Sequence, residues 1–201
     1  MKNIQKEKNL EKSLYSHYNF LKGRIAEAIV ERLFISLNMI PIHNGIEFRH
    51  PDIAYMRRNG QVSEERIKNI EFGSDFIVRS AQRNQNGEYE VYQVEVKFSK
   101  DNKCDLRRLE VYNNEEMIFI FVGFKGFWCA TKKEVAMLNN IKIIDYSSLK
   151  ELKDHSLFAF NDAEKEIISA FSEFTQATLS QIEESKSFKN RLSDYFSEDG
   201  K

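Results

Sequence analysis

The sequence predicts an α/β fold in which a mixed central sheet of four or five strands is flanked by helices. Three patterns carry the prediction: a long helical period at the start, two alternating strands joined by Asn86-Gly87, and a continuously apolar run at 117–124. A short apolar run without alternation suits a strand that is covered on both faces. Helices on both sides of a sheet provide that cover, so we expect one shared core.

Residues 10–38 are expected to form the opening helix. Their apolar side chains recur at the three- and four-residue spacing of a single helix face: Ala26, Ile29, Val30, Leu33, Phe34 and Leu37. Pro41 lacks the backbone N–H that a helix interior needs, so the helix must end before it. Residues 45–56 can form a strand, and the charged stretch 57–72 is typical of an exposed loop with a short helix.

Two strands with alternating polar and apolar residues are expected at about 75–82 and 88–99. Asn86-Gly87 lies between them and is the strongest short signal for a β-hairpin. The apolar residues of both strands fall on one face, which we therefore expect to be buried: Phe76, Val78, Val94, Val96 and Phe98.

The opposite face of this hairpin gathers charge. A three-residue loop that pairs Asn84 with Glu88 sets Asp75 opposite Lys97, counting outward along the two strands. Glu95 and Lys97 are two residues apart on one strand, so their side chains share a face. Two acids and a lysine would then meet at one end of the ribbon, whereas a slip of one residue would part them.

Two converging carboxylates repel each other unless a cation lies between them. Mg²⁺ and Mn²⁺ prefer oxygen ligands, and Mg²⁺ keeps several waters. A nearby ammonium such as that of Lys97 could orient or deprotonate one water for attack on phosphorus, which is metal-assisted phosphodiester hydrolysis. The alternative is a surface strand with an acid–lysine pair, which is the commoner origin of Glu-x-Lys taken alone.

At these residues the sequence resembles the PD-(D/E)xK nuclease superfamily, in which an acid starts one strand and Glu-x-Lys lies on the next. Ser74 stands where that pattern has its loosely kept proline. Residues 19–31, with Lys22-Gly23 near their start, look like the opening helix of the Holliday-junction-resolvase-like branch. A helical glutamate there joins the metal site, and position by position it is Glu27. The resemblance covers roughly residues 19–131.

The resemblance implies a restriction-endonuclease-like core and a Mg²⁺- or Mn²⁺-dependent endonuclease acting on DNA rather than RNA. Asp75, Glu95 and the Val96 carbonyl would hold the metal, and Glu27 would join them directly or through water. Lys97 would position or activate the attacking water. Two alternatives stay open: a non-catalytic nucleic-acid or protein-binding module on the same scaffold, and an effector or toxin nuclease that needs a partner.

A basic cluster follows the Glu-x-Lys strand, in part on a short helix expected at 105–113. Its members are the candidate nucleic-acid-binding residues: Lys100, Lys103, Arg107 and Arg108. Phosphate contact needs only positive charge near the strand end. A solvated face is the alternative for each of them, and Arg57, Arg58 and Arg66 are a second candidate surface.

The rest of the core is expected after residue 117. A central strand at 117–124 is followed by its neighbour at 127–130, in which Trp128 belongs to the core. A short helix near 131–138 and an edge strand near 141–145 close a core that spans residues 1–145. Residues 146–201 are expected to form a helical extension whose main helix, 163–184, could cover the sheet, pair with a second subunit or dock a partner.

Composition limits the function further. The chain is 41% hydrophobic and 30% charged, with a net charge of −1, whereas a protein that coats DNA would be far more basic. Cys104 and Cys129 lack CxxC spacing, so a zinc site is not expected. The start lacks an apolar signal region, and no run approaches the roughly 18 apolar residues of a membrane helix. A cytoplasmic protein with no membrane partner is therefore expected.

Overall fold

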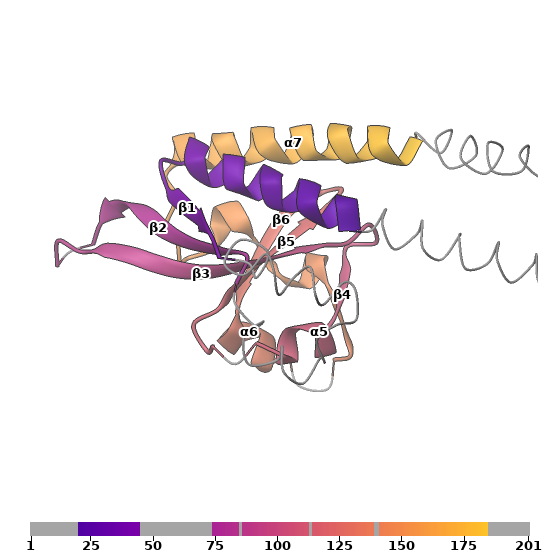
Figure 1. Ribbon diagram of the computed structural model, residues 1–201, viewed down its shortest axis with the longest axis horizontal. Helices are drawn as coiled ribbons and strands as arrows, with labels where there is room; N and C mark the ends of the chain where they lie inside the picture. The colour runs from indigo at the N-terminus through magenta and orange to yellow at the C-terminus, as the bar shows by residue number, and fades with distance from the viewer. Residues whose placement is uncertain (1–19, 45–73, 85, 113, 139–140, 185–201) are drawn as a thin grey trace, which may run out of the picture.

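The computed structural model describes residues 20–44, 74–84, 86–112, 114–138 and 141–184. Within them the protein is mixed α/β, with a central sheet between two layers of helices (Figure 1). The opening helix, residues 20–36, and α7 (Asp162–Glu184) lie over one face of the sheet. The short helices α5 (Arg107–Glu110) and α6 (Lys132–Ala136) lie on the other side. The predicted fold class is confirmed at this level.

The main sheet has six strands in the order β1-β2-β3-β5-β6-β8. Their bounds are Ile40–His43, Phe76–Arg83, Tyr89–Phe98, Ile118–Gly123, Gly126–Thr131 and Lys150–Glu151. Only β3 and β5 run parallel; every other pair in this sheet is antiparallel. The sheet is therefore mixed, as predicted.

A second, two-stranded sheet pairs β4 (Lys103–Asp105) with β7 (Ile143–Asp145). The strand expected near 141–145 exists, but it does not lie at the edge of the main sheet. Each of these short strands buries its middle residue, Cys104 or Ile144, in the core beneath α5 and α6. That burial draws β7 to β4, and β8 takes the edge position beside β6.

The opening helix ends in a Schellman motif built on Asn38. Asn38 adopts the left-handed conformation, with φ 58°. The Met39 N–H donates to the Phe34 carbonyl at 2.9 Å and the Asn38 N–H donates to the Ile35 carbonyl at 3.0 Å. Pro41 follows in β1, where an edge strand tolerates its missing N–H. The strand expected at 45–56 and the loop expected at 57–72 lie outside the described residues.

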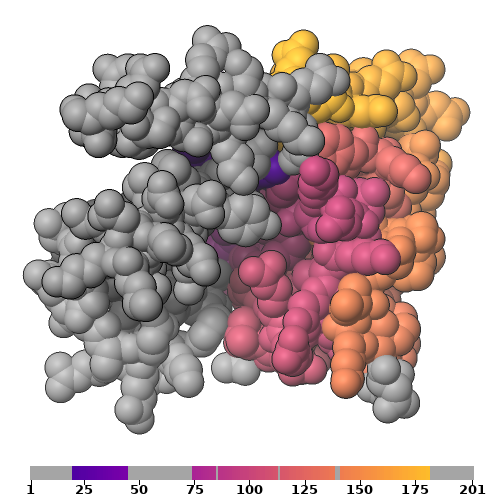
Figure 2. Space-filling view, turned by 90° about the vertical axis from the view of Figure 1, so that its right-hand side faces the viewer, coloured from indigo at the N-terminus to yellow at the C-terminus, as the bar shows by residue number. Residues whose placement is uncertain are grey.

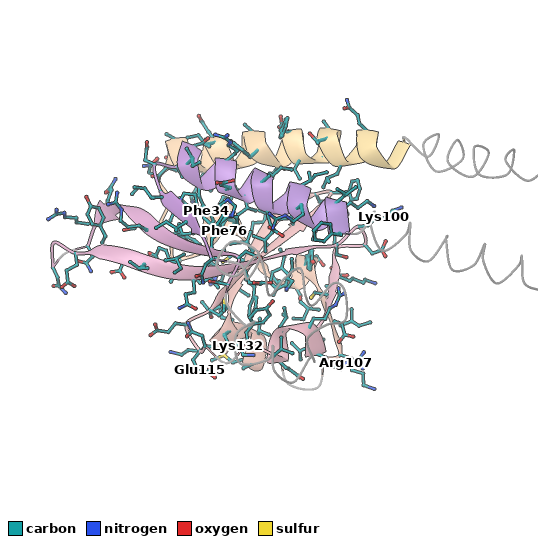
Figure 3. The ribbon with its side chains drawn as sticks, viewed as in Figure 1. Phe34, Phe76, Lys100, Arg107, Glu115 and Lys132 are labelled. Atoms are coloured by element: carbon teal, nitrogen blue, oxygen red, sulfur yellow. The ribbon has the colours of Figure 1, made fainter. Side chains whose placement is uncertain are left out.

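The two faces of the sheet bury two separate cores. Phe76, Val78, Val94 and Val96 are buried in one core with the opening helix, as predicted for that face, whereas Phe98 is only partly buried against it. Figure 3 shows Phe34 of the helix beside Phe76 of β2. All six residues of β5 are buried, because alternate side chains enter the two cores, and Trp128 is buried beside Tyr146. The predictions of a central strand covered on both faces and of a core Trp128 are confirmed.

Near its turn, the β2–β3 hairpin has the predicted register. Gly87 is left-handed, with φ 79°, and the Asn84 N–H donates to the Glu88 carbonyl at 2.7 Å. Farther along, a β-bulge sets residues 80–82 of β2 opposite Glu90 alone. The Ser80 hydroxyl occupies the bulge, donating to the Gln82 carbonyl at 2.7 Å and accepting from the Glu90 N–H at 3.0 Å.

The bulge corrects the predicted partner of Asp75. Beyond it Phe76 lies opposite Val94, so the register continues to place Asp75 beside Glu95 rather than opposite Lys97. The displacement is two residues, and side chains alternate with a period of two. Asp75, Glu95 and Lys97 therefore remain on one face although the predicted pairing was wrong.

Residues on both sides of position 145 share the main sheet. β8 pairs with β6, and Tyr146 and Leu152 are fully buried. α7 places Ile168 in the core shared with the opening helix, so this helix covers the sheet. In Figure 2, α7 (yellow to light orange) lies along the top of the face in view. Below it, the pink middle of the chain and the orange segment that follows lie side by side. None of the described helices combines the length and apolarity needed to span a membrane.

Candidate functional site

Asp75, Glu95 and Lys97 meet at the start of β2. Asp75 lies directly before β2, and Glu95 and Lys97 lie on the neighbouring β3. An Asp75 carboxylate oxygen, Oδ2, accepts the Val96 N–H at 2.7 Å. This bond replaces a backbone bond of the ladder at the point where β2 begins, so the side chain of Asp75 is fixed against β3. In a strand, the N–H and C=O of one residue face the same neighbour, so the Val96 carbonyl faces the Asp75 side as well.

Asn44 holds the segment before β2 in place. Its backbone N–H donates to the Asp75 carbonyl at 2.8 Å, and its side-chain amide donates to the Ser74 hydroxyl at 3.2 Å. Ser74 is fully buried, so its hydroxyl needs such a partner. Sequence reasoning missed Asn44, because no local pattern links it to a residue thirty positions away.

Glu95 is the most deeply buried charge of the site, at 6% exposure. One of its oxygens, Oε1, accepts hydrogen bonds from the Lys97 ammonium and from the Tyr112 hydroxyl, each at 2.5 Å. Lys97 also donates to the Tyr112 oxygen at 2.8 Å. The three groups therefore close a triangle, and each side of it is a hydrogen bond.

Tyr112 is a second residue of the candidate site that sequence reasoning missed. It follows α5 and packs its ring edge-on against Phe119, with ring centroids 5.6 Å apart. The side chain of Lys97 is only 22% exposed, because it lies against Tyr112. A tyrosine shortly after the Glu-x-Lys strand was the only available signal, and only the tertiary fold gives it meaning.

The pKa of Asp75 depends on its burial and on the acids around it. Burial, and then the negative charges of Glu95 and Glu27, hold the pKa of Asp75 well above its ordinary value. The hydrogen bond from Val96 and the charge of Lys97 oppose that shift without cancelling it. The Asp75 carboxyl is therefore poorly solvated, and the charges of two glutamates act on it.

Glu27 reaches the site from the opening helix. Its side chain is 17% exposed and accepts a hydrogen bond from Arg24 at 2.6 Å. Its negative charge acts on Asp75, so the helix delivers it to the same locality. Hydrogen bonds thus tie Asp75 and Lys97 to β3 at Val96 and Glu95, whereas Glu27 is linked to the site through the effect of its charge on Asp75.

The carboxylates are not arranged as a closed metal cage. Within the described ranges, no three His, Cys, Asp or Glu side chains form a group that could hold a metal ion. The hydrogen bonds give the reason: Glu95 turns toward Lys97 and Tyr112, and Glu27 turns toward Arg24. Binding a cation would require Glu95 to turn toward Asp75.

The four expected nucleic-acid contacts are all exposed. Figure 3 shows Lys100 and Arg107 well apart. Arg107 makes bidentate bonds to Asp105, of 2.5 Å at the shortest, and these hydrogen bonds lower the pKa of Asp105 to about 2. Arg107 is thus already paired with an acid. The second candidate surface at Arg57, Arg58 and Arg66 lies outside the described residues.

Comparison of the chain with protein-family models, curated proteins and solved structures finds no match.

Proposed function

We propose that the protein is a Mg²⁺- or Mn²⁺-dependent nuclease that hydrolyses phosphodiester bonds in DNA. The observation that carries the proposal is the meeting of Asp75, Glu95 and Lys97 on one face of two adjacent strands. This is the arrangement that the PD-(D/E)xK pattern requires. A mixed sheet between helix layers, with Glu27 delivered by the opening helix, supports a restriction-endonuclease-like core.

The donor chemistry fits a hard divalent cation. Asp75, Glu95 and the Val96 carbonyl supply oxygen, the ligand type that Mg²⁺ and Mn²⁺ prefer, and Glu27 would join directly or through water. A cation among these acids would relieve the repulsion that raises the pKa of Asp75. When bound, such a cation would polarise the phosphate and make its coordinated water more acidic.

In the proposed reaction, Lys97 acts on the attacking water. Its Nζ is held by two acceptors, Glu95 and the Tyr112 hydroxyl. When Glu95 turns toward Asp75, Lys97 keeps the Tyr112 oxygen as its anchor and can direct its remaining N–H groups to water or to a phosphate oxygen. Tyr112 stays protonated, because burial and then the charge of Glu95 raise the pKa of its hydroxyl.

The decisive experiment incubates the full chain with plasmid, single-stranded DNA, a four-way junction and RNA, with Mn²⁺ and with EDTA. We expect Mn²⁺-dependent cleavage of DNA that is abolished by Asp75→Ala and by Lys97→Ala. Glu173→Gln, which removes an exposed acid of α7, is the matched control and should cut normally. Circular dichroism shows whether each variant is folded. Normal cleavage by a folded Asp75 or Lys97 variant would refute this site.

Metal binding separates the proposal from a non-catalytic module on the same scaffold. Calorimetric titration with Mn²⁺ should show binding to the wild type and weak or no binding to Asp75→Asn and Glu95→Gln. A folded wild-type protein that binds no Mn²⁺ and cuts no substrate would favour the binding-module alternative.

A further inference from the structure

The hairpin of β2 and β3 projects beyond the rest of the sheet (Figure 1). On one side β1 pairs with β2 only as far as Arg79, and on the other β5 begins its pairing at Val94. The segment from Arg79 to Val91, here called the hairpin arm, therefore has an outer part that no third strand supports among the described residues.

One face of the hairpin arm carries two arginines around a tyrosine. The guanidinium carbon of Arg79 lies 4.3 Å from the centre of the Tyr89 ring, and that of Arg83 lies 5.1 Å from it. Tyr89 is 39% exposed. The Nε of Arg79 is buried and has no hydrogen-bond partner within the described residues, but Arg79 as a whole is only partly buried and Arg83 is exposed.

This face is continuous with the candidate active site. Alternate residues of β3 share a face, so Tyr89 and Glu95 point to the same side. The contact between Arg79 and Tyr89 confirms that the arginine is on that side too. The acids of the arm, Glu88 and Glu90, are offset from Tyr89 by one residue and fall on the other face.

The rise per residue of a strand gives the distance from Glu95 to the arginines of the hairpin arm. At about 3.3 Å per residue, Val91, which pairs with Arg79, is about 13 Å from Glu95, and Tyr89 is about 20 Å from it. Duplex DNA advances about 3.4 Å per base pair. The arginines would therefore meet backbone about four to six base pairs from the bond held at Asp75 and Glu95.

We propose that Arg79 and Arg83 bind backbone phosphates of duplex DNA on one flank of the cleavage position, with Tyr89 bracing both guanidiniums. The inference rests on the proposed function for the position of the cleaved bond. Duplex DNA is the ligand because the proposed function acts on DNA and the arginines contact the backbone on a flank of the cleaved bond.

The test measures binding of a fluorescently labelled 30-base-pair DNA duplex to the full chain in EDTA across a salt series. The double variant Arg79→Gln/Arg83→Gln is compared with Lys133→Gln/Lys150→Gln, which removes the same charge from exposed sites on α6 and β8. Two lost phosphate contacts should reduce the slope of log affinity against log salt by about 1.8. Affinity should fall roughly sixtyfold at 0.1 M salt, if the electrostatic term vanishes near 1 M.

The control double variant should keep the wild-type slope, and both variants should keep Mn²⁺ binding. If the arginines only brace the hairpin, the arm variant would melt earlier while its salt slope stayed at the wild-type value, and the proposal would be wrong. An equal loss in the control, or tighter binding of an RNA duplex, would also overturn it. Because EDTA removes the need for cleavage, these outcomes stand apart from a failure of the nuclease assay.

Discussion

Replacing Asp75 by asparagine is expected to stabilise the folded protein at neutral pH in EDTA. Asp75 has a folded-state pKa well above its ordinary value, because of burial and then of the charges on Glu95 and Glu27. A carboxyl group shifted this way stabilises the fold fully at a pH below its unfolded-state pKa, and that contribution is lost as the pH rises through the folded-state pKa. At neutral pH, where Asp75 of the unfolded chain is ionised, the raised folded-state pKa therefore destabilises the fold, and asparagine removes that cost.

The gain in stability expected for Asp75→Asn can be estimated from the charge next to Asp75 and from its hydrogen bond to Val96. Adjacent residues on paired strands have Cβ atoms about 5 Å apart, and two like charges at that distance repel by about 3 kcal/mol at an effective dielectric constant of about 20. Against this, the 2.7 Å bond from Val96 becomes a bond to a neutral amide oxygen, which costs about 1 kcal/mol. Allowing for relaxation, we expect a net gain of about 1–2 kcal/mol, or roughly 3–6 °C in melting temperature.

Thermal unfolding followed by circular dichroism at pH 7.5 and at pH 4, both in EDTA, measures this gain. The difference between Asp75→Asn and the wild type should shrink at pH 4, because Asp75 then carries a proton in the folded state. Asp101→Asn, at an exposed position, is the control and should change little. Adding Mn²⁺ at pH 7.5 should raise the melting temperature of the wild type alone. An Asp75→Asn protein that melts below the wild type at pH 7.5 would refute the electrostatic account of the site.

Three further substitutions have expected outcomes that unfolding and activity measurements can check. Tyr112→Phe keeps the ring but removes a hydroxyl bonded to a buried carboxylate, so it should cost about 1.5–3 kcal/mol in urea unfolding and slow cleavage; wild-type stability would contradict the triangle. Gly23→Ala should stabilise the opening helix by about 0.5–1 kcal/mol, because a Cβ there meets no atom within 4 Å; a lower melting temperature would count against that. Thr131→Ala breaks the capping box with Glu134 and should cost about 1 kcal/mol, and an unchanged denaturation midpoint would contradict that role.

Elements with a strong local signal could be predicted from the sequence. β2, β3, β5, β6, α6 and α7 lie close to their expected positions, because alternation, a continuous apolar run and helical periodicity each report a local environment. β4, β7 and β8 were missed or misplaced, since strands of two or three residues carry too little pattern. Their pairing is decided by which residue, such as Ile144, the tertiary core can bury.

Some features of the candidate site could likewise be predicted from the sequence, and others could not. Which residues share a face follows from the two-residue period of a strand, so Asp75, Glu95 and Lys97 could be grouped from the sequence. Their register could not, because the bulge at Ser80 depends on one hydroxyl that satisfies two backbone groups. Asn44 and Tyr112 could not be found either, since each acts on the site across a distance in the chain that no local pattern records.

Tyr112 shows how an apolar core can border a charged site. Glu95 and Lys97 lie beside Phe119 and Phe121 in the parallel pairing of β3 and β5, so their charges are close to aromatic core side chains. The ring of Tyr112 belongs to that core, while its hydroxyl donates to Glu95 and accepts from Lys97. The carboxylate of Asp75 accepts only the Val96 N–H among the hydrogen bonds described above, and that bond and the charge of Lys97 do not cancel the effects of burial and of the two glutamates on its pKa. A purely structural cluster would lose stability on either substitution, whereas a site awaiting a cation should lose it with Tyr112→Phe and gain it with Asp75→Asn. The opposite signs of these two changes therefore separate the interpretations before any substrate is known.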